Sequence, residues 1–209
     1  MNPASDSAAP GQGLIDYFRD LPNAVTFCGL VAGLGALGCL TRERFGAALA
    51  LALLAVLIDQ LDGRLALARP QRSAAVRAFG AHLDCYADFV SKGVFPALML
   101  LLVGDFGLGF WVVAAVHLIS IATRYSYEFV PDAPRRGLSP DYSILTFGLL
   151  YYAAAGLGNL YPVLLAGAML VLCGLNLAPM APPPKLKGAS FFIFLAIAGG
   201  EILLLLGSR

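Results

Sequence analysis

The chain has 209 residues, of which 59% are hydrophobic and 13% charged, and its formal net charge is +1. Soluble domains carry about 25% charged residues, so this composition argues against a water-soluble enzyme. The near-zero net charge argues against a nucleic-acid-binding protein, which needs a positive field. Four widely spaced cysteines form neither a metal-binding pair nor a disulfide framework. We therefore expect an integral membrane protein with several spans.

The predicted elements begin after a small, polar segment, residues 1–13, which we expect to be disordered. The next residues, LIDYFRD at 14–20, predict a short interfacial helix. A membrane-spanning helix needs about 20 mostly apolar residues. The candidate spans, in chain order, are residues 22–40, 45–69, 75–103, 108–127, 142–156, 161–178 and 189–206. The predicted fold is an all-α bundle of about six to seven transmembrane helices, forming a single domain over residues 14–209.

The Lys and Arg residues orient this bundle, because cytoplasmic loops carry an excess of them. One face receives Arg19, Arg64, Arg69, Arg72, Arg77, Arg124, Arg135, Arg136, Lys185 and Lys187. The opposite face receives Arg42, Arg44 and Arg209. We expect the first face, with the amino terminus, to be cytoplasmic. With seven spans the carboxyl terminus is expected on the other side.

Four aspartates lie where lipid disfavours them: Asp59 and Asp62 in the second span, Asp84 and Asp88 in the third. One aspartate at the centre of a membrane helix costs about 2.5–3.5 kcal/mol. Each pair shares a helical face, and a short loop between antiparallel helices can bring both pairs together. Mg²⁺, Mn²⁺ or Ca²⁺ would offset the repulsion between these carboxylates. The alternative is that the four acids are solvated at the interface or paired with nearby arginines.

Small residues accompany the acids: Gly63 follows Asp62, Ala66 lies one turn later, and Gly80 lies one turn before Asp84. Bare helix surface beside a metal cluster leaves room for a bulky ligand such as a nucleotide. The alternative is close packing between membrane helices.

Taken together, these residues resemble the signature of the CDP-alcohol phosphotransferase family, D-x2-D-G-x2-A-R followed by G-x3-D-x3-D. The matching residues here are Asp59, Asp62, Gly63, Ala66, Gly80, Asp84 and Asp88. Leu67 stands in place of the signature arginine, and Arg69 is the nearest candidate to replace it. The stretch FGAHLDCYADFVSKGVFPAL is most similar to the phosphatidylserine synthase branch. Cys85 and Lys92 stand where that branch has serine and phenylalanine.

The resemblance implies metal-dependent transfer of a phosphatidyl group from CDP-diacylglycerol to an alcohol, with release of CMP. It favours L-serine as the acceptor and implies two divalent cations, Mg or Mn, with Ca as a further option. Asp59, Asp62, Asp84 and Asp88 are the expected metal ligands, and Asp88 is the expected general base. The resemblance also suggests a homodimer. We expect a bacterial or archaeal cell membrane, with the active site at the cytoplasmic face.

The expected substrate contacts are Gly63, Ala66, Gly80, Arg69, Arg124 and Arg136. Lys92 lies one turn after Asp88 and is expected to pair with it, contact substrate, or serve only a structural role. Alternatives are the same chemistry with glycerol 3-phosphate, an inositol phosphate or choline. A cation transporter and an inactive membrane scaffold are alternatives from other functional classes.

Overall fold

The computed structural model describes residues 13–134, 136–181 and 189–207, and this part is helical throughout, without a β-strand. Its elements are α1 (Leu14–Phe18), α2 (Leu21–Leu40), α3 (Phe45–Leu67), α4 (Ala74–Asp88), η2 (Phe89–Val94), α5 (Phe95–Val103), α6 (Leu108–Tyr127), α7 (Asp141–Leu157), η3 (Gly158–Leu160), α8 (Tyr161–Leu177) and α9 (Ala189–Gly207). Each predicted span contains a helix, and the predicted all-α membrane bundle is confirmed. The segment predicted to be disordered lies almost entirely outside the described residues.

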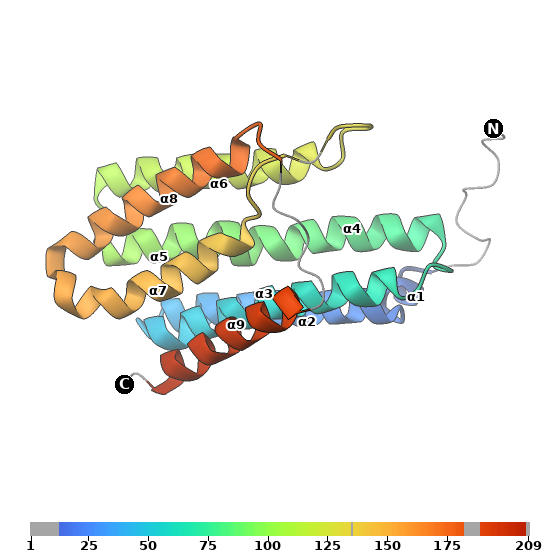
Figure 1. The fold of residues 1–209 in the computed structure, drawn as a ribbon, viewed down its shortest axis with the longest axis horizontal. Helices are drawn as coiled ribbons and strands as arrows, with labels where there is room; N and C mark the ends of the chain where they lie inside the picture. Colours follow the sequence, from blue (N-terminus) through green and yellow to red (C-terminus); the bar gives the residue numbers. More distant parts are fainter. Residues whose placement is uncertain (1–12, 135, 182–188, 208–209) are drawn as a thin grey trace.

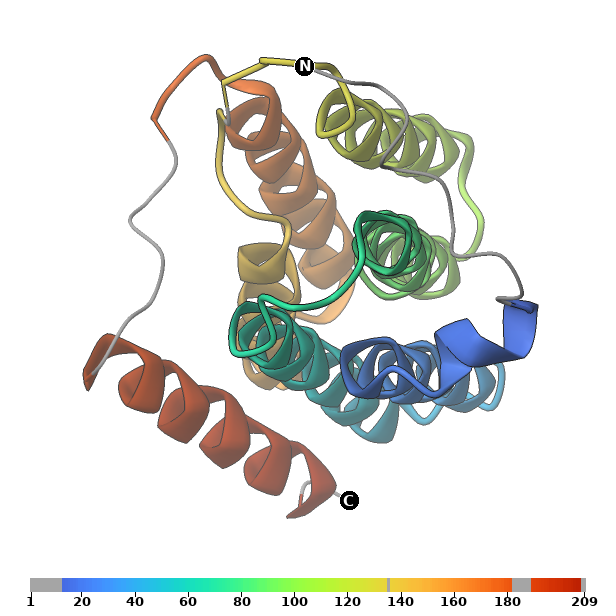
Figure 2. The same ribbon diagram turned by 90° about the vertical axis from the view of Figure 1, so that its right-hand side faces the viewer.

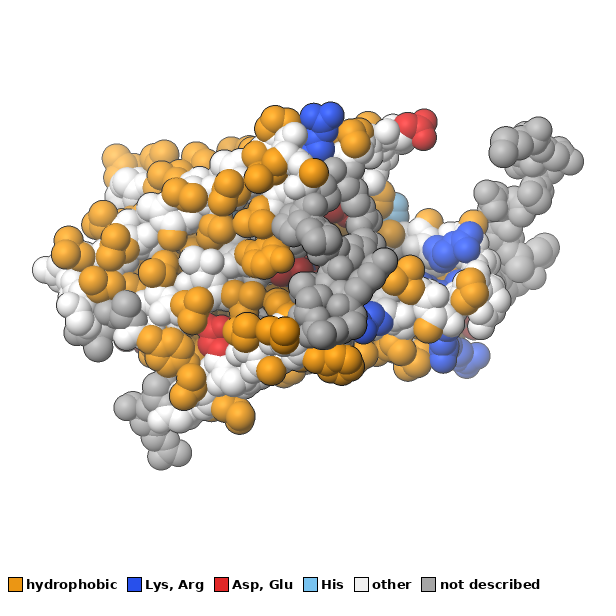
Figure 3. Space-filling model, viewed as in Figure 1, with side chains coloured by type: hydrophobic (Ala, Val, Ile, Leu, Met, Phe, Trp, Pro, Cys, Tyr) orange, Lys and Arg blue, Asp and Glu red, His pale blue; other side chains and the backbone are white. Residues whose placement is uncertain are grey.

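Within the described residues, five segments are long and apolar enough to cross a membrane: Leu21–Leu40, Phe45–Leu67, Ala74–Val103, Leu108–Tyr127 and Gly158–Leu177. A shorter apolar helix covers Phe192–Gly207. The helix α7 has 17 residues, which is near the lower limit for a span. The large apolar side chains exposed along these helices suit a lipid environment. In Figure 3 the left part of the visible surface is mostly hydrophobic, and the visible Lys and Arg side chains lie at the right and along the upper edge.

The long helices run side by side in layers (Figure 1). The continuous rod of α4, η2 and α5 lies between the α2–α3 pair and the α6–α8 pair, and α7 packs against α3 and α8. The last helix, α9, packs on the outside of α3 and stands at the edge of the bundle in Figure 2. This arrangement places the end of α3 beside α4, which forms the polar end of the rod, and α1 lies at the same end of the bundle.

Local signals explain where α3 ends and α4 begins. The helix α3 ends at Leu67, two residues earlier than predicted, and Pro70 follows in the connecting loop. The side chain of Ser73 accepts a hydrogen bond from the Val76 N–H (3.3 Å) and caps α4. The short loop makes α3 and α4 antiparallel, so the aspartates at the end of one helix face those on the other.

The third predicted span is continuous but contains the π-helical turn η2. Pro96 has no N–H to give to the carbonyl of Lys92, four residues earlier. His117 on α6 occupies that carbonyl instead, with its Nε2 3.0 Å from the Lys92 oxygen. Because a carbonyl can only accept, His117 donates from Nε2. The proline and the histidine together account for a local change in helix type that periodicity alone does not reveal.

The apolar core lies away from the aspartates, between the first half of α3 and the helices α2, α5, α7 and α8. Its fully buried members include Leu40, Leu53, Phe95, Phe147 and Met169. The described arginines of the two predicted faces lie at opposite ends of the bundle. The α3–α4 hairpin and the end of α6 carry most of the first set, and the α2–α3 loop carries the other. Arg135, Lys185, Lys187 and Arg209 lie outside the described residues.

Candidate active site

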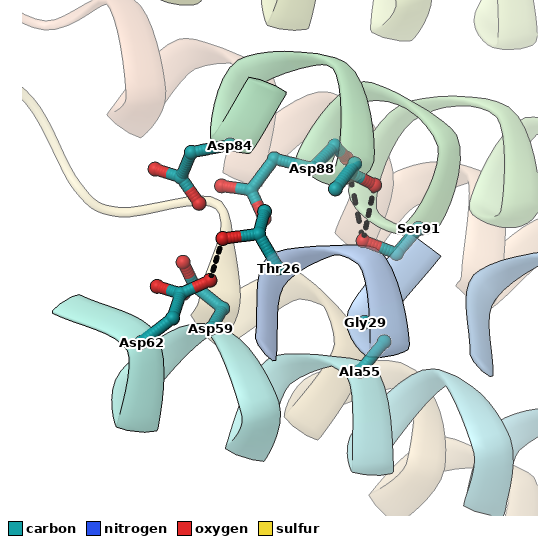
Figure 4. A pocket seen from close by; sticks show the side chains of 9 residues that line it. Thr26, Gly29, Ala55, Asp59, Asp62, Asp84, Asp88 and Ser91 are labelled. Atoms are coloured by element: carbon teal, nitrogen blue, oxygen red, sulfur yellow. Dashed lines mark hydrogen bonds between the residues drawn. The ribbon is translucent and has the colours of Figure 1, made fainter. Parts of the chain in front are cut away.

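Four aspartates gather where α3 faces α4. Asp59 and Asp62 on α3 point toward Asp84 and Asp88 on α4, as Figure 4 shows. Oxygens from Asp59, Asp84 and Asp88 lie within 4.8 Å of one another. Two like charges about 4 Å apart repel by about 4 kcal/mol at an effective dielectric constant of about 20. The cluster therefore needs compensating positive charge.

One compensating charge comes from Lys92 on η2. Its ammonium group forms ion pairs with Asp88 Oδ1 (2.7 Å), Asp59 Oδ2 (3.0 Å) and Asp141 Oδ1. Lys92 is only 1% exposed, so its charge is held inside the protein. Among the three sequence-based expectations for Lys92, the ion pair with Asp88 is confirmed, and the structure adds two partners from α3 and α7.

Hydroxyl and amide groups bind one further oxygen each of Asp62, Asp88 and Asp141. Thr26 on α2 donates to Asp62 Oδ2 (2.6 Å), and Tyr125 on α6 donates to Asp88 Oδ2 (2.9 Å). Gln60 donates to Asp141 Oδ2 (3.0 Å). Donor side chains from α2, α3, η2 and α6 thus fix the orientation of the cluster, in the manner of a preorganised site.

A pocket of about 630 Å³ opens beside the cluster and is lined by Asp59, Asp62 and Asp84. Among the predicted substrate contacts, Gly63, Ala66, Gly80 and Arg124 line this pocket. Arg69, which follows the end of α3, and Arg136, which precedes α7, do not line it. Three other arginines line the pocket: Arg64, Arg72 and Arg77. The pocket therefore has basic side chains, although Leu67 stands in place of the signature arginine. The roles of all these residues remain predictions.

The two signature glycines have different surroundings. A Cβ atom at Gly63 would meet no described atom within 4 Å, so the helix surface there faces open space. A Cβ atom at Gly80 would collide with the side-chain oxygen of Asn23 and press on Arg72. Arg72 in turn donates to Asn23 Oδ1 (2.8 Å) and pairs with Asp20 (2.7 Å). Gly63 therefore matches the expectation of ligand space, whereas Gly80 also permits close packing of α2 on α4.

The donor set suits hard divalent cations. Every candidate ligand is a carboxylate oxygen, which Mg²⁺, Mn²⁺ and Ca²⁺ prefer. Asp84 Oδ1 is buried and has no hydrogen-bond partner among the described residues, and burying such an atom without a partner is unfavourable. Among the described residues of this cluster, five carboxylates, including Asp141, face one ammonium group, so the acids outnumber the positive charge. Divalent cations would supply positive charge at this place.

Sequence reasoning missed several members of the cluster. Asp141 begins α7, 53 residues after Asp88, and no motif spacing connects it to the other acids. The one signal in the sequence was that Asp141 is an acidic residue directly before the span predicted at residues 142–156. Thr26 and Tyr125 lie within apolar spans, where a single polar residue is ordinarily taken as a packing contact. Only the arrangement of the helices brings these residues to the aspartates.

Comparison with known proteins gives a consistent result. The family model for CDP-alcohol phosphatidyltransferase matches residues 19–178, which include all five acids of the cluster. The chain is also 33% identical over 126 residues to CDP-diacylglycerol–serine O-phosphatidyltransferases of Mycobacterium bovis and Mycobacterium tuberculosis. That match covers 59% of this chain and 41% of each relative. Because the family match extends over most of the sequence, the chain belongs to the CDP-alcohol phosphatidyltransferase family.

Proposed function

We propose that this protein transfers the phosphatidyl group of CDP-diacylglycerol to the hydroxyl group of L-serine, releasing CMP and forming phosphatidylserine. The observation that carries the proposal is that Asp59, Asp62 and Asp84 line a pocket of about 630 Å³, with Asp88 next to Asp59 and Asp84. The pocket has bare helix surface at Gly63 for a nucleotide. The mycobacterial relatives support serine as the acceptor by their names.

In this proposal Asp59, Asp62, Asp84 and Asp88 hold two divalent cations, Mg²⁺ or Mn²⁺. Bound there, the cations supply charge stabilisation for the pyrophosphate and for the leaving CMP. Asp88 is the proposed general base, taking the proton of the acceptor hydroxyl. Both of its oxygens have partners, Lys92 and Tyr125, so turnover requires one of these contacts to open. Tyr125 is the simpler one to move, since it makes a single hydrogen bond.

The lining of the pocket includes opposite charges that suit an amino acid as the acceptor. Arg124 lies 3.8 Å from Glu128, and both line the pocket together with Asp141. Arg124 Nε is buried and has no hydrogen-bond partner among the described residues. We assign Arg124 to the carboxylate of serine and Glu128 to its ammonium group. Glycerol 3-phosphate and an inositol phosphate lack the ammonium group, and choline lacks the carboxylate.

The test is CMP release by the purified protein, with CDP-diacylglycerol, Mn²⁺ or Mg²⁺, and each candidate acceptor in turn. We expect release with serine. Release only with another acceptor would keep the reaction class but reject serine, and no release with any acceptor would reject the transferase proposal. The cation-transporter alternative predicts cation uptake into vesicles without CMP, and an inactive scaffold predicts neither activity.

Arg124→Gln is the sharper variant for the acceptor assignment. Loss of a charged hydrogen bond of about 1.5–3 kcal/mol raises the KM for serine about 10- to 100-fold. The KM for CDP-diacylglycerol is expected to stay unchanged. Arg42→Gln, at the opposite end of the bundle, is the matched control. An equal effect of Arg124→Gln on both substrates would contradict the assignment.

The cytoplasmic position of the site and the homodimer belong to the same proposal. The arginines near the pocket, Arg64, Arg72 and Arg77, support the cytoplasmic orientation through the positive-inside rule. Labelling of single cysteines placed in the α3–α4 loop, from either side of sealed vesicles, tests this orientation.

A further inference from the structure

Lys92 has the most unusual environment in the described part of the chain. It is 1% exposed, and its ammonium joins three carboxylates from three helices, Asp59, Asp88 and Asp141. Two of these acids belong to the proposed metal ligands. This lysine therefore lies among the groups that are proposed to hold the cations.

The backbone around Lys92 also keeps it in this place. The π-helical turn η2 and the missing N–H of Pro96 leave the Lys92 carbonyl to His117, which lies 3.0 Å away on α6. Cys173 on α8 lies 3.6 Å from the other ring nitrogen of His117. The lysine is therefore fixed through its backbone by α6 and α8 and through its side chain by α3, α4 and α7.

We propose that Lys92 is a resident cation of the active site, which sets how tightly the aspartate cluster binds divalent metal ions. The inference rests on the metal site of the proposed function. The ammonium occupies Asp59 Oδ2 and Asp88 Oδ1, so an incoming cation must share or displace these contacts. At the same distance, the Lys92 ammonium repels a divalent cation twice as strongly as it attracts one carboxylate. Lys92 thus weakens metal binding while it keeps the acids together when no metal is bound.

Lys92 is accordingly a positioning residue, and Asp141 assists it. Asp141 contacts the ammonium from the start of α7 and is itself held by Gln60 Nε2 at 3.0 Å. By drawing the ammonium toward α7, Asp141 reduces its competition with a metal ion for Asp59 and Asp88. The two residues are therefore expected to have opposite effects on metal affinity.

The test is Mn²⁺ binding to the purified protein in detergent, measured by calorimetry without any substrate. Lys92→Met removes the charge and keeps the length of the side chain, and we expect it to lower the Kd for Mn²⁺ at least tenfold. It should also lower the melting temperature in EDTA and enlarge the rise in melting temperature that Mn²⁺ produces. Lys92→Arg keeps the charge and is expected to leave the Kd for Mn²⁺ within threefold of the wild-type value.

Asp141→Asn and the double variant keep the test decisive if Lys92→Met fails to fold. Asp141→Asn is expected to raise the Kd for Mn²⁺ several-fold. The Lys92→Met/Asp141→Asn variant has the wild-type net charge, and its Kd should return to near the wild-type value. An unchanged Kd in Lys92→Met or in Asp141→Asn, while the wild type binds Mn²⁺, would overturn this inference and leave the metal site of the proposed function standing. Absence of Mn²⁺ binding in the wild type would overturn both the inference and the metal site of the proposed function.

Discussion

Two regions of this protein bury carboxylates among apolar helices, and their surroundings differ. The cluster on α3, α4 and α7 contains Lys92 and hydroxyl donors and adjoins a pocket. On α9, Glu201 is alone: it is 5% exposed, and neither of its side-chain oxygens has a hydrogen-bond partner among the described residues. It lies against Gly148 of α7. A buried acid in a membrane protein is a candidate for function, but partners and ligand space distinguish a site from a packing contact.

The largest expected effect comes from removing an acid of the cluster on α3 and α4. Asp84→Asn takes away a proposed metal ligand whose Oδ1 has no protein partner, and CMP release should fall by at least about a hundredfold. Asp88→Asn should also abolish most turnover, by about 10²- to 10⁴-fold, if Asp88 is the base. Both variants are expected to keep the helical circular dichroism of the wild type.

Glu201→Gln is the matched control for these variants, because it changes a buried acid of the other region to its amide. We expect its rate of CMP release to stay within about twofold of the wild type. If Glu201→Gln were as inactive as Asp84→Asn, Glu201 on α9 would also be needed for activity, and the functional distinction between the two regions would be wrong. An active Asp88→Asn variant would reject the base assignment.

Metal removal tests the same distinction without a mutation. EDTA should eliminate CMP release and lower the melting temperature, because stabilisation by a bound ligand follows from its binding to the native state. Mn²⁺ or Mg²⁺ in excess should restore both. Glu201→Gln should respond as the wild type does, whereas Asp84→Asn should show a smaller rise in melting temperature. Full activity in EDTA would contradict the two-cation proposal.

A pair of glycines gives the smallest expected effects. Gly63 faces open pocket, so Gly63→Leu should raise the KM for CDP-diacylglycerol about tenfold, or about 1.4 kcal/mol, with little change in stability. Gly148 lies against Glu201, so Gly148→Ala should lower the free energy of unfolding by about 1–3 kcal/mol with an unchanged KM. Thermal unfolding and steady-state kinetics on both variants separate the two results. A rise in KM for Gly148→Ala would contradict the comparison.

Much of the fold was predictable because membrane spans are long apolar runs with charged ends. Each predicted span contains a helix, and the boundary at Pro70 was placed within two residues. The π-helical turn was not predicted, because its cause is a contact between the Lys92 carbonyl and His117 that joins different helices. Periodicity reports which residues share a face of one helix, and it carries no information on such pairings.

The site was predictable to the extent that it lies in one segment. Asp59, Asp62, Asp84 and Asp88 are close in sequence, and the short loop after α3 ensures that they meet. Asp141 reaches the same place only through the packing of α7 against α3. The contacts of Gly80 with Asn23 likewise depend on how α2 lies across α4, which the amino-acid spacing does not determine.

The π-helical turn η2 lets the rod of α4 and α5 carry one additional residue without turning its two halves relative to each other. An extra residue in a regular α-helix would rotate one half by about 100°, whereas a π-helical turn accommodates one residue more within a single turn. Asp84 and Asp88 therefore keep the face that Asp59 and Asp62 meet, while α5 keeps its place in the apolar core. A related sequence that is one residue shorter within Phe89–Val94, with a regular α-helical turn there, would share both the bundle and the alignment of its acids.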